Sequence, residues 1–168
     1  FDESEGQRFT GAIGLQKNEG LVKFRNVYLK PIGGEPLFNG IDLDGWRVVP
    51  GSGGTFEVNE DDYSILAKGG LGFLETVDEW DNFILQFEAK TNGKDTNSGI
   101  FFRLNPGTKK SQSDGYELQI DSSVIGDDQS KPKNAGTGAV FRRTTARWVG
   151  SKDDEWFTAT LVAHGDRF

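Results

Sequence analysis

Residues 82–90 read NFILQFEAK, a short stretch in which apolar and polar side chains take turns. Apolar residues occupy every second position from Phe83 to Ala89, and polar residues fill the alternate positions from Gln86 to Lys90. Successive side chains of a β-strand point to opposite faces of its sheet. This period of two therefore predicts a strand with one apolar face and one polar face.

The same alternation recurs along the chain, and no stretch sustains a helical period. The candidate strands are 11–16, 21–30, 46–49, 55–58, 63–67, 71–76, 82–90, 98–104, 115–121, 137–143 and 155–163. Glycine-rich turn signals separate most of them, and the polar, proline-containing segment 127–134 is interpreted as a surface loop. Many short strands at this spacing predict an all-β antiparallel sandwich or barrel.

Two of these strands, SGIFFRL at 98–104 and GYELQID at 115–121, each have a polar face as well as an apolar one. The side chains expected on the polar faces are Phe101, Arg103, Glu117, Gln119 and Asp121. Aromatic rings cover the C–H faces of sugars, and planar polar groups pair with hydroxyls, so this set can form a sugar-binding floor. The alternative interpretation is an ordinary solvated face of a half-buried antiparallel sheet.

The two carboxylates of this set do not form a close catalytic pair. Glu117 and Asp121 are four residues apart on one strand, which separates them by about 13 Å. Glycosidases that use two carboxylates hold them about 5 Å apart or, in the inverting class, up to about 9.5 Å apart. One carboxylate acting alone as a general base remains open.

The composition limits the class of protein. The chain has 168 residues, enough for one domain with a real core, and its 13 Phe and 23 Gly suit strands and turns. A net charge of −7 disfavours nucleic acid and anionic membrane surfaces as partners. The chain contains no Cys and no apolar run of membrane-spanning length. It also contains no Met, so we expect a processed chain or a module of something longer.

Six phrases occur in the order typical of one family. They are PLFNGIDLDGW (36–46), FLETVDEWDNFILQFEAK (73–90), TNSGIFFR (96–103), GYELQI (115–120), GTGAVF (136–141) and EWFTATLVAHGDRF (155–168). Together they resemble the 3-keto-disaccharide hydrolase domain, with Phe141 where Tyr is usual. The resemblance implies a concanavalin A-like jelly-roll β-sandwich, antiparallel throughout, over residues 36–168.

The first residues resemble the end of the same domain. GAIGLQ (11–16) and VKFRNVYLKP (22–31) are similar to the family's closing strands, yet they precede its opening phrase. Residues 1–31 are thus expected to be a C-terminal-type hairpin, and residues 36–168 the main domain. Three explanations stay open: tandem domains, a circular permutation, and donation of the hairpin to an identical neighbour.

The resemblance implies that the chain cleaves the glycosidic bond of sugars oxidised at C3. Such a site needs a base for the C2 proton, an acid for the leaving group, and a cation or donor at the ketone oxygen. On this chain we expect Glu117 as the base and Arg103 as the oxyanion partner. The expected substrate-binding residues are Asn97, Phe101, Gln119 and Asp121. No cofactor is expected, although Glu117 and Asp121 offer carboxylates to a divalent metal.

A second hypothesis is a non-catalytic module that binds carbohydrate or assembles outside the cell through residues 1–31. The short, rotated chain and Phe141 favour it, because fold does not fix function. Under both hypotheses we expect a carbohydrate ligand and a secreted or periplasmic location.

The histidine and an arginine pair each allow two interpretations. His164 is the only histidine and precedes Gly165, so it is interpreted as a turn residue rather than a catalytic one. The pair Arg142–Arg143, together with Arg147, either meets a carboxylate or phosphate, or ends a solvated strand and balances the acidic run 153–155.

Overall fold

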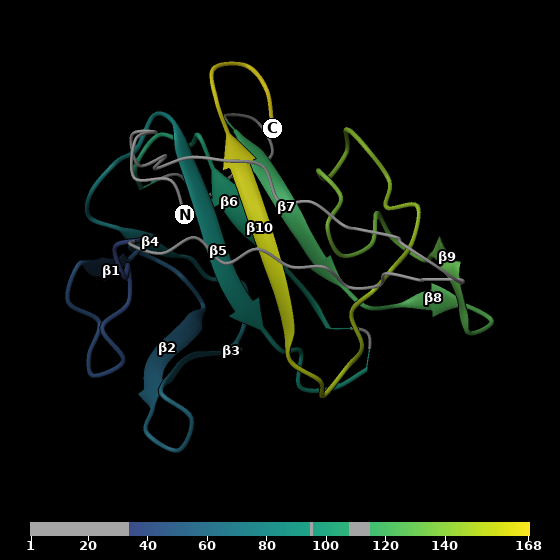
Figure 1. Cartoon of the computed structure of the whole chain (residues 1–168). Helices are drawn as coiled ribbons and strands as arrows, with labels where there is room; N and C mark the ends of the chain where they lie inside the picture. The colour runs from purple at the N-terminus through teal and green to yellow at the C-terminus, as the bar shows by residue number, and fades with distance from the viewer. Residues whose placement is uncertain (1–33, 95, 108–114) are drawn as a thin grey trace, which may run out of the picture. The chain divides into compact units, whose positions relative to one another are not determined.

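The computed structural model describes residues 34–94, 96–107 and 115–168 (Figure 1). The chain divides after Glu35, and the unit described below runs from Pro36 to Phe168. The strands predicted at 11–16 and 21–30, and with them the expected hairpin of residues 1–31, lie outside the described residues. The described part of the chain contains ten strands and no helix.

The strands pair into five antiparallel ladders of two strands each. The smaller ladders are β1 (Trp46–Val48) with β4 (Leu74–Thr76), β2 (Gly54–Asn59) with β3 (Ser64–Gly69), and β8 (Val124–Ile125) with β9 (Asp128–Pro132). The two central ladders are β5 (Phe83–Ala89) with β10 (Phe157–Ala163), and β6 (Asn97–Phe102) with β7 (Tyr116–Asp121). The prediction of an all-β antiparallel fold is confirmed.

The main core lies between the two central ladders, which form two layers in Figure 1. Leu161 of β10 is buried against Phe102 of β6 and Leu118 of β7. Partly buried side chains from both layers pack around them: Phe83, Leu85, Phe87, Ile100 and Tyr116. Two ladders that pack their apolar faces together have the arrangement of a β-sandwich.

The alternation predicted for residues 82–90 is present in β5. Its side chains are partly buried and exposed in turn, and β10 follows the same order in register with it. Leu161 is therefore buried while the next residue, Val162, is 48% exposed. The outward position beside Val162 is taken by Ile84, which is also exposed.

The predicted strand at 137–143 is wrong, since that segment is irregular. Gly136 and Gly138 have φ values of +84° and +88°, which are left-handed conformations that interrupt a strand. The segment nevertheless runs along β7, because the Phe141 N–H donates to the Glu117 carbonyl at 2.9 Å and the Gln119 N–H to the Ala139 carbonyl at 2.8 Å. β7 therefore has a backbone partner on each edge, β6 on one and this segment on the other.

The predicted surface loop at 127–134 is also wrong, because it contains β9. Gly126 and Asp127 both have positive φ, at +60° and +59°, and join β8 to β9 as a tight hairpin turn. The Asp128 carboxylate accepts hydrogen bonds from the backbone N–H and the hydroxyl of Ser130. The segment lacks an apolar alternation, which is why its pattern resembled a loop.

Candidate functional site

The polar row of β7 is buried rather than solvated. Gln119 is 1% exposed and Asp121 is 5% exposed, whereas Glu117 is half-buried. Across the ladder, Glu117 faces Phe101 and Gln119 faces Gly99. The interpretation of this row as a solvated face is therefore wrong for Gln119 and Asp121. Polar groups that are kept inside a fold need partners or a function, so their surroundings matter.

The carboxylate of Glu117 occupies space left by Gly99 on the neighbouring strand. A Cβ atom on Gly99 would lie 2.6 Å from the Glu117 Oε1 atom, so the side chain leans across the ladder toward β6. Burial raises the pKa of Glu117 above its ordinary value, and the positive charge of Arg142 partly lowers it again. A carboxylate with a raised pKa is a better proton acceptor than one in water.

Arg142 is the cation that acts on this carboxylate. It has a φ of +60°, an uncommon conformation for a residue with a side chain. Its guanidinium lies 5.6 Å from the centre of the Phe141 ring. Sequence reasoning did not place Arg142 among the site residues, although it noted that the pair Arg142–Arg143 can meet a carboxylate.

The acidic run near this pair is engaged elsewhere. The Asp153 carboxylate accepts a hydrogen bond from the Thr91 hydroxyl at 2.8 Å, and Glu155 lies 3.7 Å from Lys152. The interpretation of Arg142–Arg143 as a counterweight to residues 153–155 therefore finds no support in these contacts.

The side-chain amide of Gln119 is held through its nitrogen atom. Its Nε2 donates to the Asn97 Oδ1 at 2.6 Å, so two of the predicted substrate-binding residues are joined. Its Oε1 is buried and has no hydrogen-bond partner in the described part of the chain. An unpaired buried acceptor is costly, and a donor from a ligand hydroxyl would satisfy it.

Asp121 has a local structural role. Its Oδ1 accepts a hydrogen bond from the Ser123 N–H at 2.9 Å, which shapes the turn after β7. Its own N–H donates to the Thr137 hydroxyl at 2.9 Å. Among the described residues, no group of three or more His, Cys, Asp or Glu side chains is placed to hold a metal ion.

Arg103 is directed away from the polar row. Its guanidinium donates to the Asp81 carboxylate at 3.1 Å and to the Gly165 carbonyl at 2.8 Å. Its φ of +57° ends the strand alternation that had placed it beside Phe101. Phe101 itself stays on β6 opposite Glu117 and packs edge-to-face against Phe73 at 5.4 Å.

The histidine lies in a turn, as the sequence predicts. His164 and Arg167 exchange backbone hydrogen bonds of 2.9 and 3.1 Å around Gly165 and Asp166. The Gly165 N–H also donates to the Asn82 Oδ1 at 2.7 Å, so this turn is tied to the chain that enters β5.

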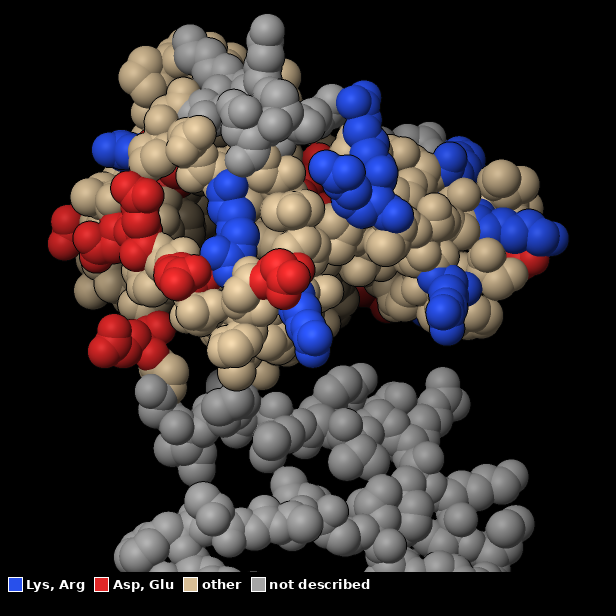
Figure 2. All heavy atoms as spheres, turned by 90° about the horizontal axis from the view of Figure 1, so that it is seen from above, with Lys and Arg blue, Asp and Glu red and all other residues tan. Residues whose placement is uncertain are grey.

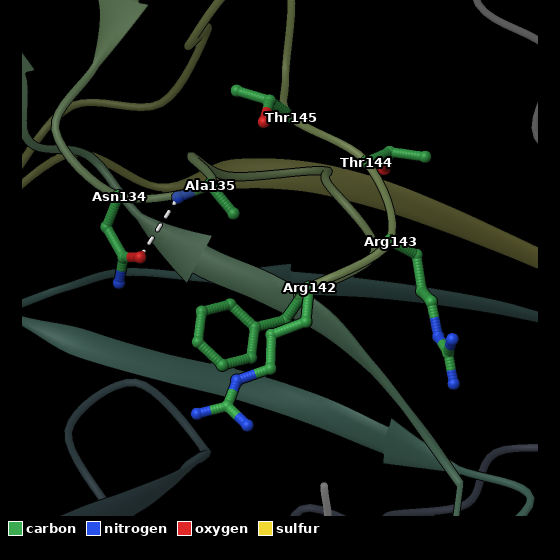
Figure 3. Close-up of a pocket in the computed structure, with 7 residues that line it drawn as sticks. Asn134, Ala135, Arg142, Arg143, Thr144 and Thr145 are labelled. Atoms are coloured by element: carbon green, nitrogen blue, oxygen red, sulfur yellow. Dashed lines mark hydrogen bonds between the residues drawn. The ribbon is translucent and has the colours of Figure 1, made fainter.

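An open hollow of about 540 Å³ lies on the segment that follows β9 (Figure 3). Its lining residues are Asn134, Ala135, Phe141, Arg142, Arg143, Thr144 and Thr145. Two residues that line the hollow act on Glu117 of β7: the Phe141 N–H donates to its backbone carbonyl, and the charge of Arg142 lowers the pKa of its carboxyl group. The structure thus places a half-buried carboxylate, a buried amide and an aromatic ring on the β6–β7 ladder, with the Arg142 charge acting on the carboxylate, and such groups suit a polar ligand.

A comparison with protein families gives one match. The family model described as the 3-keto-alpha-glucoside-1,2-lyase-like domain matches residues 33–168. No curated protein and no solved structure matches the chain. In the residues that the structure describes, no helix has the length and apolar character needed to cross a membrane.

Proposed function

The chain belongs to the 3-keto-alpha-glucoside-1,2-lyase-like domain family, and from this we propose that it cleaves the glycosidic bond of 3-keto-glycosides by base-assisted elimination. The family supports a role in carbohydrate chemistry. The observation that carries the elimination mechanism is the half-buried Glu117, whose pKa is raised by burial.

The reaction needs one proton acceptor at the C2 position of the sugar. A ketone at C3 makes the C2–H bond acidic, and the Glu117 carboxylate takes that proton. The electron pair of the C–H bond becomes the C1–C2 double bond, while the C1–O bond breaks and its pair stays on the oxygen of the second sugar or aglycone, which takes up a proton from solvent and leaves as the alcohol. Addition of water across the double bond then completes a net hydrolysis. A positioned base of this kind contributes roughly 10²–10⁴-fold to a rate.

Negative charge develops on the ketone oxygen as the proton leaves, and a nearby cation lowers the cost of that charge. We assign this role to Arg142, because it is the cation that already acts on Glu117. Arg103, the residue expected from the sequence, is held by Asp81 and Gly165. We therefore assign Arg103 a positioning role between the start of β5 and the turn after β10.

The buried amide supports binding of the sugar. The Gln119 Oε1 has no partner among the described residues, and its side chain is held in place by Asn97. A sugar hydroxyl that donates to this oxygen would satisfy it. Phe101, opposite Glu117, offers a ring for a C–H face of the sugar.

The test is the substitution Glu117→Gln, assayed with a 3-keto-glucoside. The variant keeps the shape of the side chain but cannot accept the proton, so we expect turnover to fall by about 10³-fold or more. Asp121→Asn serves as a matched control, because Asp121 is engaged by the backbone of Ser123. An unchanged rate in Glu117→Gln would remove Glu117 from the mechanism. Sugar binding without turnover in the wild-type protein would favour the non-catalytic module instead.

A further inference from the structure

The hollow on residues 134–145 is lined by two guanidinium groups that form no direct ion pair in the described part of the chain. Neither Arg142 nor Arg143 is within ion-pair distance of a carboxylate in the described part of the chain. Both residues are exposed. Arginine is the side chain best suited to paired hydrogen bonds with carboxylate, sulfate and phosphate groups.

Each guanidinium lies over an aromatic ring. Arg142 lies over Phe141, and Arg143 lies over Tyr116 at 5.9 Å from the ring centre. Stacking on a ring orients a guanidinium while its N–H donors stay available at the edge. Figure 3 shows both side chains extending from the same side of the loop.

The loop that carries the pair is tightly bonded. The N–H groups of Arg143 and Thr144 both donate to the Val140 carbonyl, at 2.9 and 2.8 Å. The Val140 N–H donates in turn to the Thr144 hydroxyl at 2.9 Å. These hydrogen bonds hold Arg142 in its left-handed conformation. Such a conformation costs free energy in a residue with a side chain, and strained residues of this kind cluster at ligand sites.

We propose that this hollow binds an oxyanion substituent, a carboxylate or sulfate, on the part of the glycoside that leaves during the reaction. Arg143 is its principal ligand, and Arg142 lies between the substituent and Glu117. The inference deepens the proposed function and rests on it, because it names acidic glycosides as the substrate class.

The experiment compares two phenyl glucosides that differ only in charge, one with a para carboxylate and one with a para carboxamide. Neither carries a 3-keto group, so binding is measured without turnover, by calorimetry or by NMR titration. For the wild-type protein we expect the carboxylate to bind about tenfold more tightly, as a charge-assisted hydrogen bond implies. Arg143→Gln should abolish this preference, and Arg143→Lys should keep part of it.

Arg147→Gln is the matched control, because Arg147 follows the same loop, is exposed and does not line the hollow. It should keep the tenfold preference. Equal binding of the two glucosides by the wild type, or a preference that survives in Arg143→Gln, would overturn the proposal. So would inorganic sulfate that binds as tightly as the carboxylated glucoside, because the hollow would then hold a free ion. A preference without turnover of any 3-keto-glycoside would sustain the anion site and remove the proposed reaction.

Discussion

Gly99 controls where the Glu117 carboxylate can lie, because the two groups share one space across the β6–β7 ladder. A methyl group at position 99 would overlap the end of the Glu117 side chain at 2.6 Å. That side chain is flexible, so it can move aside at small cost to the fold. Its proton-accepting oxygen would then be displaced.

We predict that Gly99→Ala lowers kcat/KM for a 3-keto-glucoside by about 100-fold, since small displacements of a catalytic group have effects of that size. The free energy of unfolding should change by no more than about 1 kcal/mol. Gly150→Ala is the control, because nothing lies within 4 Å of a Cβ at that position. Full activity in Gly99→Ala would show that the carboxylate position seen here is unimportant for the reaction.

The raised pKa of Glu117 predicts the pH dependence of the reaction. The base must be deprotonated, so kcat/KM should fall as the pH drops through the pKa of the free protein. Because burial raises that pKa above the reference value of 4.5, the fall should occur at a higher pH than for an exposed glutamate. Arg142 lowers the pKa, so Arg142→Gln should move the fall to a still higher pH. Arg147→Gln should leave the profile in place, and a shift to lower pH in Arg142→Gln would contradict the assignment.

At the residue scale, the sequence predicts which side chains lie together but not how they are surrounded. Alternation placed Phe101, Glu117 and Gln119 on one polar face, and the ladder then shows that Glu117 lies opposite Phe101. It did not predict the burial of Gln119, since burial depends on what other segments pack over a strand. It also failed for Arg103, where a positive φ ends the alternation without a glycine or asparagine to signal it.

At the element scale, β10 shows how closely the alternation governs packing. Leu161 is buried in the main core, and its neighbour Val162 points outward. The register with β5 places Leu161 beside Leu85 and Val162 beside Ile84. A shift of one residue in this ladder would exchange the buried and exposed rows.

We predict that Leu161→Ala destabilises the protein by about 2–5 kcal/mol, the usual cost of a cavity in a core. Val162→Ala, on the same strand, should change stability by about 0.5 kcal/mol or less. Chemical denaturation followed by tryptophan fluorescence measures both. Similar losses for the two variants would contradict the described register of β5 and β10.

The two segments that were predicted wrongly, 127–134 and 137–143, depend on left-handed backbone conformations. β8 and β9 form a polar hairpin whose turn depends on the left-handed conformations of Gly126 and Asp127. The pattern of residues 137–143 predicted a strand, yet the left-handed conformations of Gly136 and Gly138 make this segment irregular. A sequence shows that a glycine can take such a conformation, and only the packing around it determines whether it does.

At the scale of the whole molecule, the net charge of −7 is unevenly spread. On the face in Figure 2, acidic side chains gather toward one side, while Lys and Arg side chains lie across much of the rest. The net charge therefore does not describe every part of the surface. A negatively charged group can meet a basic area on a protein that is acidic overall.

The position of β7 predicts which backbone amides exchange most slowly with solvent. This strand has a backbone partner on both edges, and four of its six side chains are buried. Hydrogen exchange measured by NMR should show the amides of Leu118 and Gln119 among the slowest of the described residues. The exposed amides of the β8–β9 hairpin should exchange much faster, because local opening suffices there. Equal protection of the two regions would contradict this order.

Glu117 is part of the strand that should open last. Heat that loosens only the β8–β9 hairpin would leave the proton acceptor where it is, so this partial melting should cost little activity. Thermal inactivation should then coincide with loss of the whole fold. The temperature at which activity is lost should equal the temperature at which the domain unfolds.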